Sequence, residues 1–166
     1  MRIAIGCDHI VTDIKDKIIE MLKANKIEVI DCGTNDFKRT HYPIYGHQVA
    51  VNVVTKKADF GIVICGTGVG ITNSAQKVKG ARVVLAKDVL TAIDARQKYD
   101  ANVVGFGGRI IGIGLMYEII ESFIEAKYLG KNDALINQID SIVEKENYDS
   151  KIFDDEKHKW DQGFYN

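Results

Sequence analysis

The sequence has little of what marks secreted, membrane or metal-binding proteins. It contains three cysteines in 166 residues, and none is spaced as in a CxxC or zinc-finger motif. Asp8 and His9 interrupt the first apolar run too early for a signal peptide, and no run approaches the ~18–20 apolar residues of a membrane helix. These absences favour a cytoplasmic protein with reduced thiols.

The chain also lacks an excess of charge, proline and internal repeats. Twenty-two basic and 23 acidic residues leave a formal net charge of -1, which offers no basic footprint for nucleic acid or an anionic membrane. The single proline, Pro43, marks no linker. What is present is 46% hydrophobic residues, enough for one globular domain with a buried core.

Short β-branched runs alternate with longer amphipathic stretches. The expected strands are residues 2–7, 27–32, 60–65, 81–86 and 102–106. The expected helices are residues 12–25, 44–57, 69–78, 88–99 and 112–128, the first with Ile14, Ile18, Met21 and Leu22 on its apolar face. Nearly continuous apolar strands alternating with helices predict a parallel sheet covered on both faces. We therefore expect an α/β protein with a three-layer αβα, Rossmann-like fold and a five-stranded parallel sheet.

Two further segments follow this unit. Residues 132–146 predict an extra helix with an apolar stripe of Leu135, Ile136, Ile139, Ile142 and Val143. The polar tail 147–166 holds the aromatic residues Phe153, Trp160, Phe164 and Tyr165, so we expect it to dock on a surface. The predicted organisation is one domain over 1–146 and a tail at a subunit interface, with packing on its own chain as the alternative for both segments.

Ligands of open parallel sheets bind beyond the carboxyl ends of the strands. Three groups of residues are predicted to meet there: Cys7–His9, Cys65–Gly68 and Gly105–Arg109. The stretch CGTGVG, residues 65–70, opens a helix, and the free amides and dipole of a helix start favour an anion. It matches neither the Walker loop nor the GxGxxG fingerprint, which argues against a nucleotide.

Cys65 has two interpretations that the residues alone leave open. At a helix start, the dipole and amide donors favour a thiolate that acts as nucleophile or general base beside an oxyanion site. Alternatively, it is a small apolar residue that ends a strand. A zinc site formed by Cys7, His9 and Cys65 lacks a fourth ligand at a recognisable spacing.

The remaining polar residues also have both functional and structural interpretations. Asp8 and His9 favour a functional role because polar pairs at this edge seldom serve packing, whereas Cys7 and Cys32 favour packing. Thr40 is expected to cap the following helix, with Tyr42 packed beside it. His47 and His158 are expected to be solvated. Arg109 reaches either an anion or only solvent.

Four motifs in this order and spacing, GCDHI, RTHYPIYG, CGTGVGI and NVVGFGGRIIG, resemble the ribose-5-phosphate isomerase B / galactose-6-phosphate isomerase family. The resemblance covers about residues 1–146, and the stretch GCDHIVTD and the tail ending KWDQGFYN are similar to its galactose-6-phosphate branch. It implies interconversion of aldose and ketose phosphates through an enediolate, with no metal and no organic cofactor. The implied catalytic residues are Cys65, as the base, and Thr67, close to the sugar. The implied substrate-binding residues are Asp8, His9, Tyr42, Gly66, Gly68, Val69, Gly70 and Arg109.

The chain departs from the family pattern in one half of the site. Lys98 and Tyr99 stand where family members have RxHN with the ring-opening histidine, and LGKNDALI, residues 129–136, replaces the phosphate-gripping GGRHQxR. The resemblance therefore implies a homologous LacA-type partner subunit that supplies the missing histidine and arginines. The expected activity is conversion of D-galactose 6-phosphate to D-tagatose 6-phosphate. A self-sufficient ribose-5-phosphate isomerase B and a non-catalytic sugar-phosphate-binding subunit are the alternatives.

Overall fold

A parallel sheet forms the centre of the computed structural model, which describes residues 1–143 and 150–163. The strands are β1 (Arg2–Cys7), β2 (Glu28–Asp31), β3 (Phe60–Cys65), β4 (Val83–Leu85) and β5 (Val103–Gly107), in the order β2-β1-β3-β5-β4. All paired strands are parallel. The five predicted strands are confirmed; β2 and β4 are shorter than expected because each lies at an edge of the sheet and has only one strand partner.

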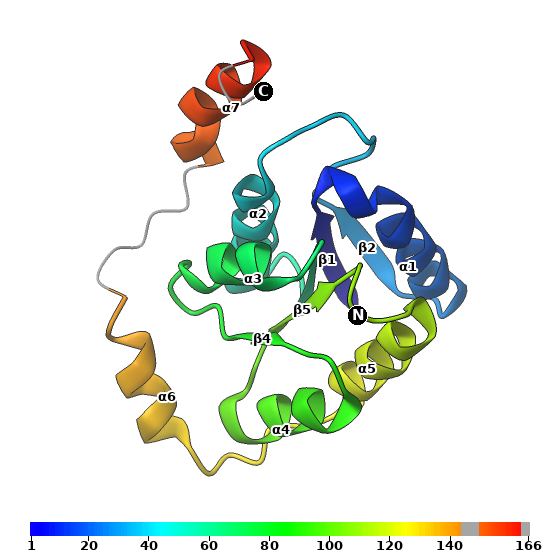
Figure 1. Ribbon diagram of the computed structural model, residues 1–166. Helices are drawn as coiled ribbons and strands as arrows, with labels where there is room; N and C mark the ends of the chain where they lie inside the picture. The colour runs from blue at the N-terminus through cyan, green and yellow to red at the C-terminus, as the bar shows by residue number, and fades with distance from the viewer. Residues whose placement is uncertain (144–149, 164–166) are drawn as a thin grey trace.

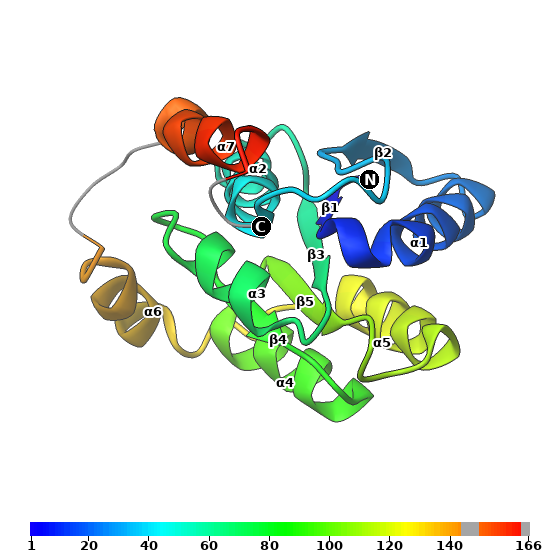
Figure 2. The same ribbon diagram turned by 45° about the horizontal axis from the view of Figure 1, so that its top comes forward.

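Helices cover both faces of the sheet (Figures 1 and 2). They are η1 (His9–Val11), α1 (Thr12–Ala24), α2 (Tyr42–Val54), α3 (Val69–Gln76), α4 (Val89–Tyr99), α5 (Ile113–Glu125), α6 (Asp133–Asp140), η2 (Ser150–Phe153) and α7 (Asp154–Asp161). Buried residues of α1, α4 and α5 form one apolar cluster with the sheet, and those of α2 and α3 form another. This arrangement confirms the three-layer αβα fold.

Alternation along the strands decides which layer each strand residue faces. Ile62 and Ile64 of β3 belong to the cluster with α1 and α5, whereas Val63 and Cys65 belong to the cluster with α2 and α3. The side chain of Cys65 therefore points into the layer that holds the helix starting immediately after its own loop.

The buried face of α1 is rotated from the predicted one. Lys15 is 0% exposed, whereas Ile14 and Met21 are only half-buried. The Lys15 Nζ donates to both carboxylate oxygens of Asp31, each at 2.8 Å, and to the side-chain oxygen of Asn35. A buried ammonium is tolerated here because an anion and an amide oxygen receive its protons.

The C-terminal segments lie outside the three layers (Figure 1). Helix α6 ends at Asp140 rather than at residue 146, and of its apolar stripe only Ile136 is buried. The predicted domain boundary near residue 146, the aromatic residues Phe164 and Tyr165 and the side chain of Trp160 lie outside the described residues. Within 1–143 and 150–163, no helix combines the length and apolar character needed to cross a bilayer.

Candidate active site

The three central strands bring the predicted groups to one edge of the sheet. Cys65 at the end of β3 pairs with Gly107 at the end of β5. The backbone N–H of Asp8 donates to the carbonyl of Ile64 at 2.8 Å, and that of Gly108 donates to the carbonyl of Cys65 at 2.8 Å. The loops after β1, β3 and β5 are therefore joined by backbone hydrogen bonds at the carboxyl edge.

The loop after β3 wraps around the sulfur of Cys65. The thiol is buried, at 6% exposure, and its Sγ accepts a hydrogen bond from the backbone N–H of Gly68 at 3.1 Å. Gly68 has a φ of +83°, and a Cβ there would lie 2.7 Å from the carbonyl carbon of Phe106. Glycine is thus required for the loop to close over β5. Thr67 and Val69 stay exposed on the outer side of the loop.

The other two cysteines have different surroundings. Burial raises the pKa of Cys7 to about 12 and that of Cys32 to about 12, so both are neutral thiols near pH 7. Neither lies in a glycine loop at a helix start. Their environment is that of packing residues, as the sequence predicts. Among the described residues no three His, Cys, Asp or Glu side chains gather as a metal site, so the zinc alternative gains no support.

Asp8 and His9 form a polar pair next to the loop. The Asp8 carboxylate caps η1 by accepting from the backbone N–H of Ile10 at 3.2 Å, and another contact joins it to Nδ1 of His9. The backbone N–H of Thr40 also points at this nitrogen, from 3.4 Å. One nitrogen cannot donate to the carboxylate and accept from the amide together; the shorter, charge-assisted contact with Asp8 is the stronger one.

Tyr42 reaches the glycine loop from the start of α2. A Cβ on Gly70 would lie 2.7 Å from two ring carbons of Tyr42 and 2.9 Å from its hydroxyl oxygen, so the ring rests directly on this glycine. The Ser74 hydroxyl donates to the carbonyl of Pro43 at 2.8 Å, which ties α3 to the start of α2. Tyr42 is therefore brought together with the loop of Cys65.

The predicted cap of this helix is wrong. The N-cap position is occupied by His41, which makes no side-chain capping bond. Thr40 instead shares a hydrogen bond of 2.8 Å with the hydroxyl of Tyr45. Helix α2 begins at Tyr42, one residue later than a Thr40 cap requires, which places Pro43 in the first turn, where proline is favoured.

The predicted solvation of His47 is also wrong: it is 7% exposed. Its ring is met edge-on by Phe153, at 5.9 Å between ring centroids. Nothing in the local sequence signals this, because the covering residue comes from the other end of the chain. His158 is exposed, as predicted.

Arg109 lies beside the same loop. Its backbone N–H donates to the carbonyl of Gly66 at 3.0 Å, and a Cβ on Gly66 would lie 4.0 Å from its Cδ. The side chain is exposed. The structure thus gathers all ten predicted site positions along one edge, with Asp8 and Cys65 buried and Arg109 on the outside.

The positions that depart from the family pattern lie at the opposite edge. Helix α4 runs back across the sheet, so its last residues, Lys98 and Tyr99, precede the start of β5. Cys65 pairs with the other end of β5, and five strand residues span roughly 16 Å. Lys98 and Tyr99 therefore cannot face Cys65 of the same chain.

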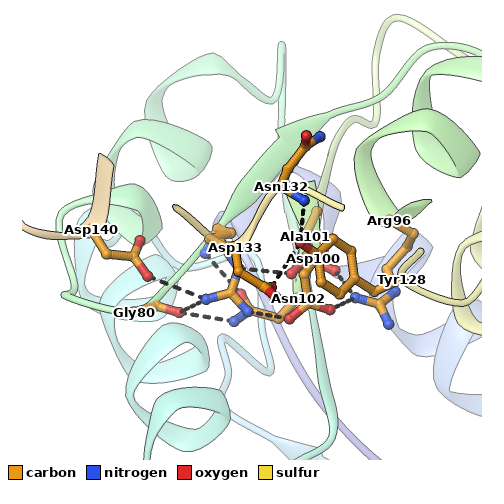
Figure 3. A network of polar contacts seen from close by, with 10 residues as sticks. Gly80, Arg96, Asp100, Ala101, Asn102, Tyr128, Asn132, Asp133 and Asp140 are labelled. Atoms are coloured by element: carbon orange, nitrogen blue, oxygen red, sulfur yellow. Dashed lines mark hydrogen bonds and ion pairs between the residues drawn. The ribbon is translucent and has the colours of Figure 1, made fainter. Parts of the chain in front are cut away.

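The second departing segment joins the first. Asn132 donates its side-chain N–H to the carbonyl of Lys98 at 2.9 Å, and the N–H of Leu129 donates to the carbonyl of Gln97 at 3.0 Å. Figure 3 shows Asn132 beside the polar network around Asp100. Residues 98–99 and 129–136 thus form one continuous region, on the far side of the sheet from the glycine loop.

Asp100 ties this region to the end of the sheet. It accepts from Arg82 Nη2 at 2.7 Å and is paired with Arg96 as well. Arg82 also reaches Asp140 at the end of α6, at 3.4 Å. In this network (Figure 3), Arg82 and Arg96 are both paired with carboxylates at the edge of the sheet opposite Cys65.

The order and spacing of the site residues agree with a known family: residues 3–142 match the Ribose/Galactose Isomerase family. The chain belongs to this isomerase family. It is 51% identical, over 99% of its length and 98% of the relative's, to galactose-6-phosphate isomerase subunit LacB of Clostridium acetobutylicum. It is 40% identical to ribose-5-phosphate isomerase B of Escherichia coli, over 88% of this chain and 99% of that protein.

Solved structures of the isomerase family agree with the fold. Ribose-5-phosphate isomerase B of Clostridium thermocellum superposes with a TM-score of 0.84 at 36% identity, covering 89% of this chain and all of that one. The type B enzyme of Trypanosoma brucei gives 0.81 at 36% identity, over 85% of this chain and 97% of the other. The chain is thus a homologue of sugar-phosphate isomerases, and an isomerase activity is supported.

Proposed function

We propose that the chain is the Cys65-bearing subunit of a heteromeric aldose–ketose isomerase that converts D-galactose 6-phosphate to D-tagatose 6-phosphate. The observation that carries this proposal is a buried thiol that accepts an amide N–H inside a glycine loop at a helix start. The 51% identity to a LacB subunit supports the substrate. The free cysteines support a reducing compartment, the cytoplasm.

In this proposal Cys65 is the general base. Its thiolate removes the proton from C2 of the open-chain aldose and returns it to C1, while a proton passes from the C2 hydroxyl to the C1 oxygen. The aldehyde becomes a hydroxymethyl group and C2 becomes the ketone, so there is no net oxidation. The amides from Gly66 to Gly70 bind the enediolate oxygens, with Thr67 near the sugar.

The same proposal assigns the walls of the pocket. Asp8, His9 and Tyr42 line the substrate, and Arg109 contacts the phosphate. No metal or organic cofactor takes part, because deprotonation next to a carbonyl needs only a base and an oxyanion site.

A homologous LacA-type partner completes the site. The family's histidine and arginine positions correspond to Lys98 and residues 129–136, which lie across the sheet from Cys65. A second subunit can place its own copy of that region against Cys65, whereas this chain's copy carries neither the histidine nor the arginines.

The base role is tested by Cys65→Ala in the complex reconstituted with the homologous partner. Loss of a general base is expected to lower kcat by ~10²–10⁴-fold, while Cys32→Ser, at a packing thiol, retains activity. An active Cys65→Ala complex would favour a non-catalytic binding subunit.

Partner dependence is tested by assaying the chain alone, the partner alone and the mixture on galactose 6-phosphate and ribose 5-phosphate. We expect high activity only in the mixture and only with galactose 6-phosphate. Full activity of the chain alone on ribose 5-phosphate would support the self-sufficient alternative, which the relatives named ribose-5-phosphate isomerase B favour.

A further inference from the structure

The C-terminal segment Ser150–Asp161 consists of η2 and α7, and η2 packs against α2; Figure 1 shows α7 following η2 at the outside of the molecule. Phe153 makes the contact. Its ring stands edge-on to His41, with centroids 6.0 Å apart and planes at 72°, and edge-on to His47, at 5.9 Å and 78°. Edge-to-face pairs at such distances are favourable beyond the area they bury, so Phe153 is held between two rings of α2 and its cap.

Two further contacts connect Phe153 to the glycine loop. The ring of His41 lies 5.8 Å from that of Tyr42, and the ring of Tyr42 rests on Gly70. His41 makes no side-chain capping bond, so this helix end is held by other contacts, among them the hydrogen bond from Ser74 to the carbonyl of Pro43 and the packing of the aromatic rings. Phe153 thus contacts, from outside, the helix end that places Tyr42 over the loop.

The segment lies beyond the part of the chain shared with ribose-5-phosphate isomerases. The family match ends at residue 142. The Escherichia coli and Clostridium thermocellum enzymes are matched over 99% and 100% of their own lengths but over only 88% and 89% of this chain. The relative named for a six-carbon sugar phosphate instead aligns over 99% of it.

We propose that Phe153 is a positioning residue for substrate length: seated on His41 and His47, it holds Tyr42 so that the pocket favours six-carbon over five-carbon sugar phosphates. A pocket distinguishes substrates that differ by one carbon by about 10–200-fold in kcat/KM. This discrimination requires that the side chains lining the pocket keep a fixed position. The inference rests on the proposed function, since it concerns the same site.

The test uses full-length chains in the complex with the homologous partner. The measured quantity is the ratio of kcat/KM for galactose 6-phosphate to that for ribose 5-phosphate. Phe153→Ala is expected to lower this ratio by about 10-fold, and Phe153→Tyr, which keeps the ring, is expected to restore it. Asp155→Asn, at an exposed position of α7, is the matched control. A loss of general stability would lower both kcat/KM values together and leave the ratio unchanged, which would overturn the proposal.

Hydrogen exchange gives a second, independent measurement. The amides of Tyr45 and Gly46, in the first turns of α2, are expected to exchange faster in Phe153→Ala than in Asp155→Asn. Equal exchange in the two variants would show that the segment does not restrain this helix end, and the proposal would fail.

The failure of this inference can be distinguished from the failure of the proposed function. If the wild-type complex does not isomerise galactose 6-phosphate, the proposed function is wrong, and so is the preference for six-carbon substrates. A normal wild-type complex with an unchanged ratio in Phe153→Ala overturns this inference alone.

Discussion

The cysteines of this chain illustrate how the same side chain serves different purposes in different surroundings. Cys7 and Cys65 both end central strands, yet they face opposite layers of the sheet. Cys7 is fully buried, and its neutral form is favoured by desolvation. Cys65 lies against the amide of Gly68 in a glycine loop. The two cysteines thus share a position at the carboxyl edge, and of the two only Cys65 has its sulfur enclosed by a glycine loop.

Alkylation tests whether Cys7 and Cys32 are buried packing thiols. Because burial raises the pKa of Cys7 and Cys32 to about 12, both should resist iodoacetamide at pH 8 in the folded protein and react after denaturation. Peptide mass mapping measures this. Rapid modification of Cys7 at pH 8 would contradict its assignment as a neutral packing thiol.

The raised pKa of Cys7 and Cys32 also makes the stability of the fold depend on pH. In the folded protein the pKa of both thiols lies above the ordinary value of 9.0. Their contribution to the free energy of unfolding is therefore present below pH 9 and is lost as the pH rises toward 12.

Lys15 is a fully buried charge that joins α1 to the end of β2. Its ammonium joins Asp31 at the end of β2 to Asn35 in the next loop. Lys15→Met is expected to lower the free energy of unfolding by about 2 kcal/mol, less than for a fully buried pair because Asp31 is partly exposed. Urea denaturation measures the change. Lys17→Met, at an exposed position of the same helix, should change little, and an equal loss in both variants would refute a specific role for the pair.

At the scale of the elements, close approach between the loop of Cys65 and its neighbours explains the glycines. Gly68 fits against the backbone of β5 and Gly70 fits under the ring of Tyr42. These two contacts join α2, α3 and β5 at the point where the candidate base lies. The elements themselves follow from ordinary patterning, but their junction depends on residues without a side chain.

Gly70→Ala tests this junction. The added Cβ would lie 2.7 Å from the ring of Tyr42, so the ring must move, and KM for the sugar phosphate is expected to rise about 10-fold. The overpacking is expected to cost about 1 kcal/mol of stability, the lower end of the usual range, because the displaced atoms are the far end of a side chain. Gly114→Ala in α5, where nothing lies within 4 Å of the added Cβ, is the control. It should leave KM unchanged and raise the free energy of unfolding by about 0.5 kcal/mol. Unchanged KM in Gly70→Ala would show that Tyr42 does not line the pocket.

At the scale of the whole molecule, the two edges of the sheet carry separate tasks. The carboxyl edge holds the candidate site, and the amino edge holds the network of Arg82 with Asp100 and Asp140. Through Asp140 this network attaches α6, most of whose apolar stripe is exposed. The ion pair between Arg82 and Asp140 thus attaches α6 to the rest of the domain at the amino edge.

Arg82→Met is expected to loosen that attachment. The variant loses the ion pairs to Asp100 and Asp140, and both partners are partly exposed, so we expect about 1–2 kcal/mol of destabilisation. Hydrogen exchange should quicken in α6 more than in α1. Uniformly faster exchange throughout the chain would indicate a general loss of stability instead.

Much of this architecture could be predicted because it depends on local patterns. Apolar runs of four to six residues are enough to identify all five strands, and the carboxyl-edge rule then predicts that Cys65 lies near Asp8. Predictions failed where a distant segment supplied the partner. The apolar face predicted for the first helix does not include Lys15, which nevertheless shares a buried face with Ile18 and Leu22. The sequence predicts a solvated His47, whereas the ring of Phe153 covers it.

The sequence by itself therefore determined the layers, the strands and the glycine loop that surrounds the candidate base, because hydrophobic period and backbone freedom are properties of neighbouring residues. Tertiary structure alone decided two further points. It placed Lys98 across the sheet from Cys65, since the crossover helix α4 reverses the direction of the chain. It also seated Phe153 on α2, because contacts between distant segments depend on how the layers pack, which no local pattern encodes.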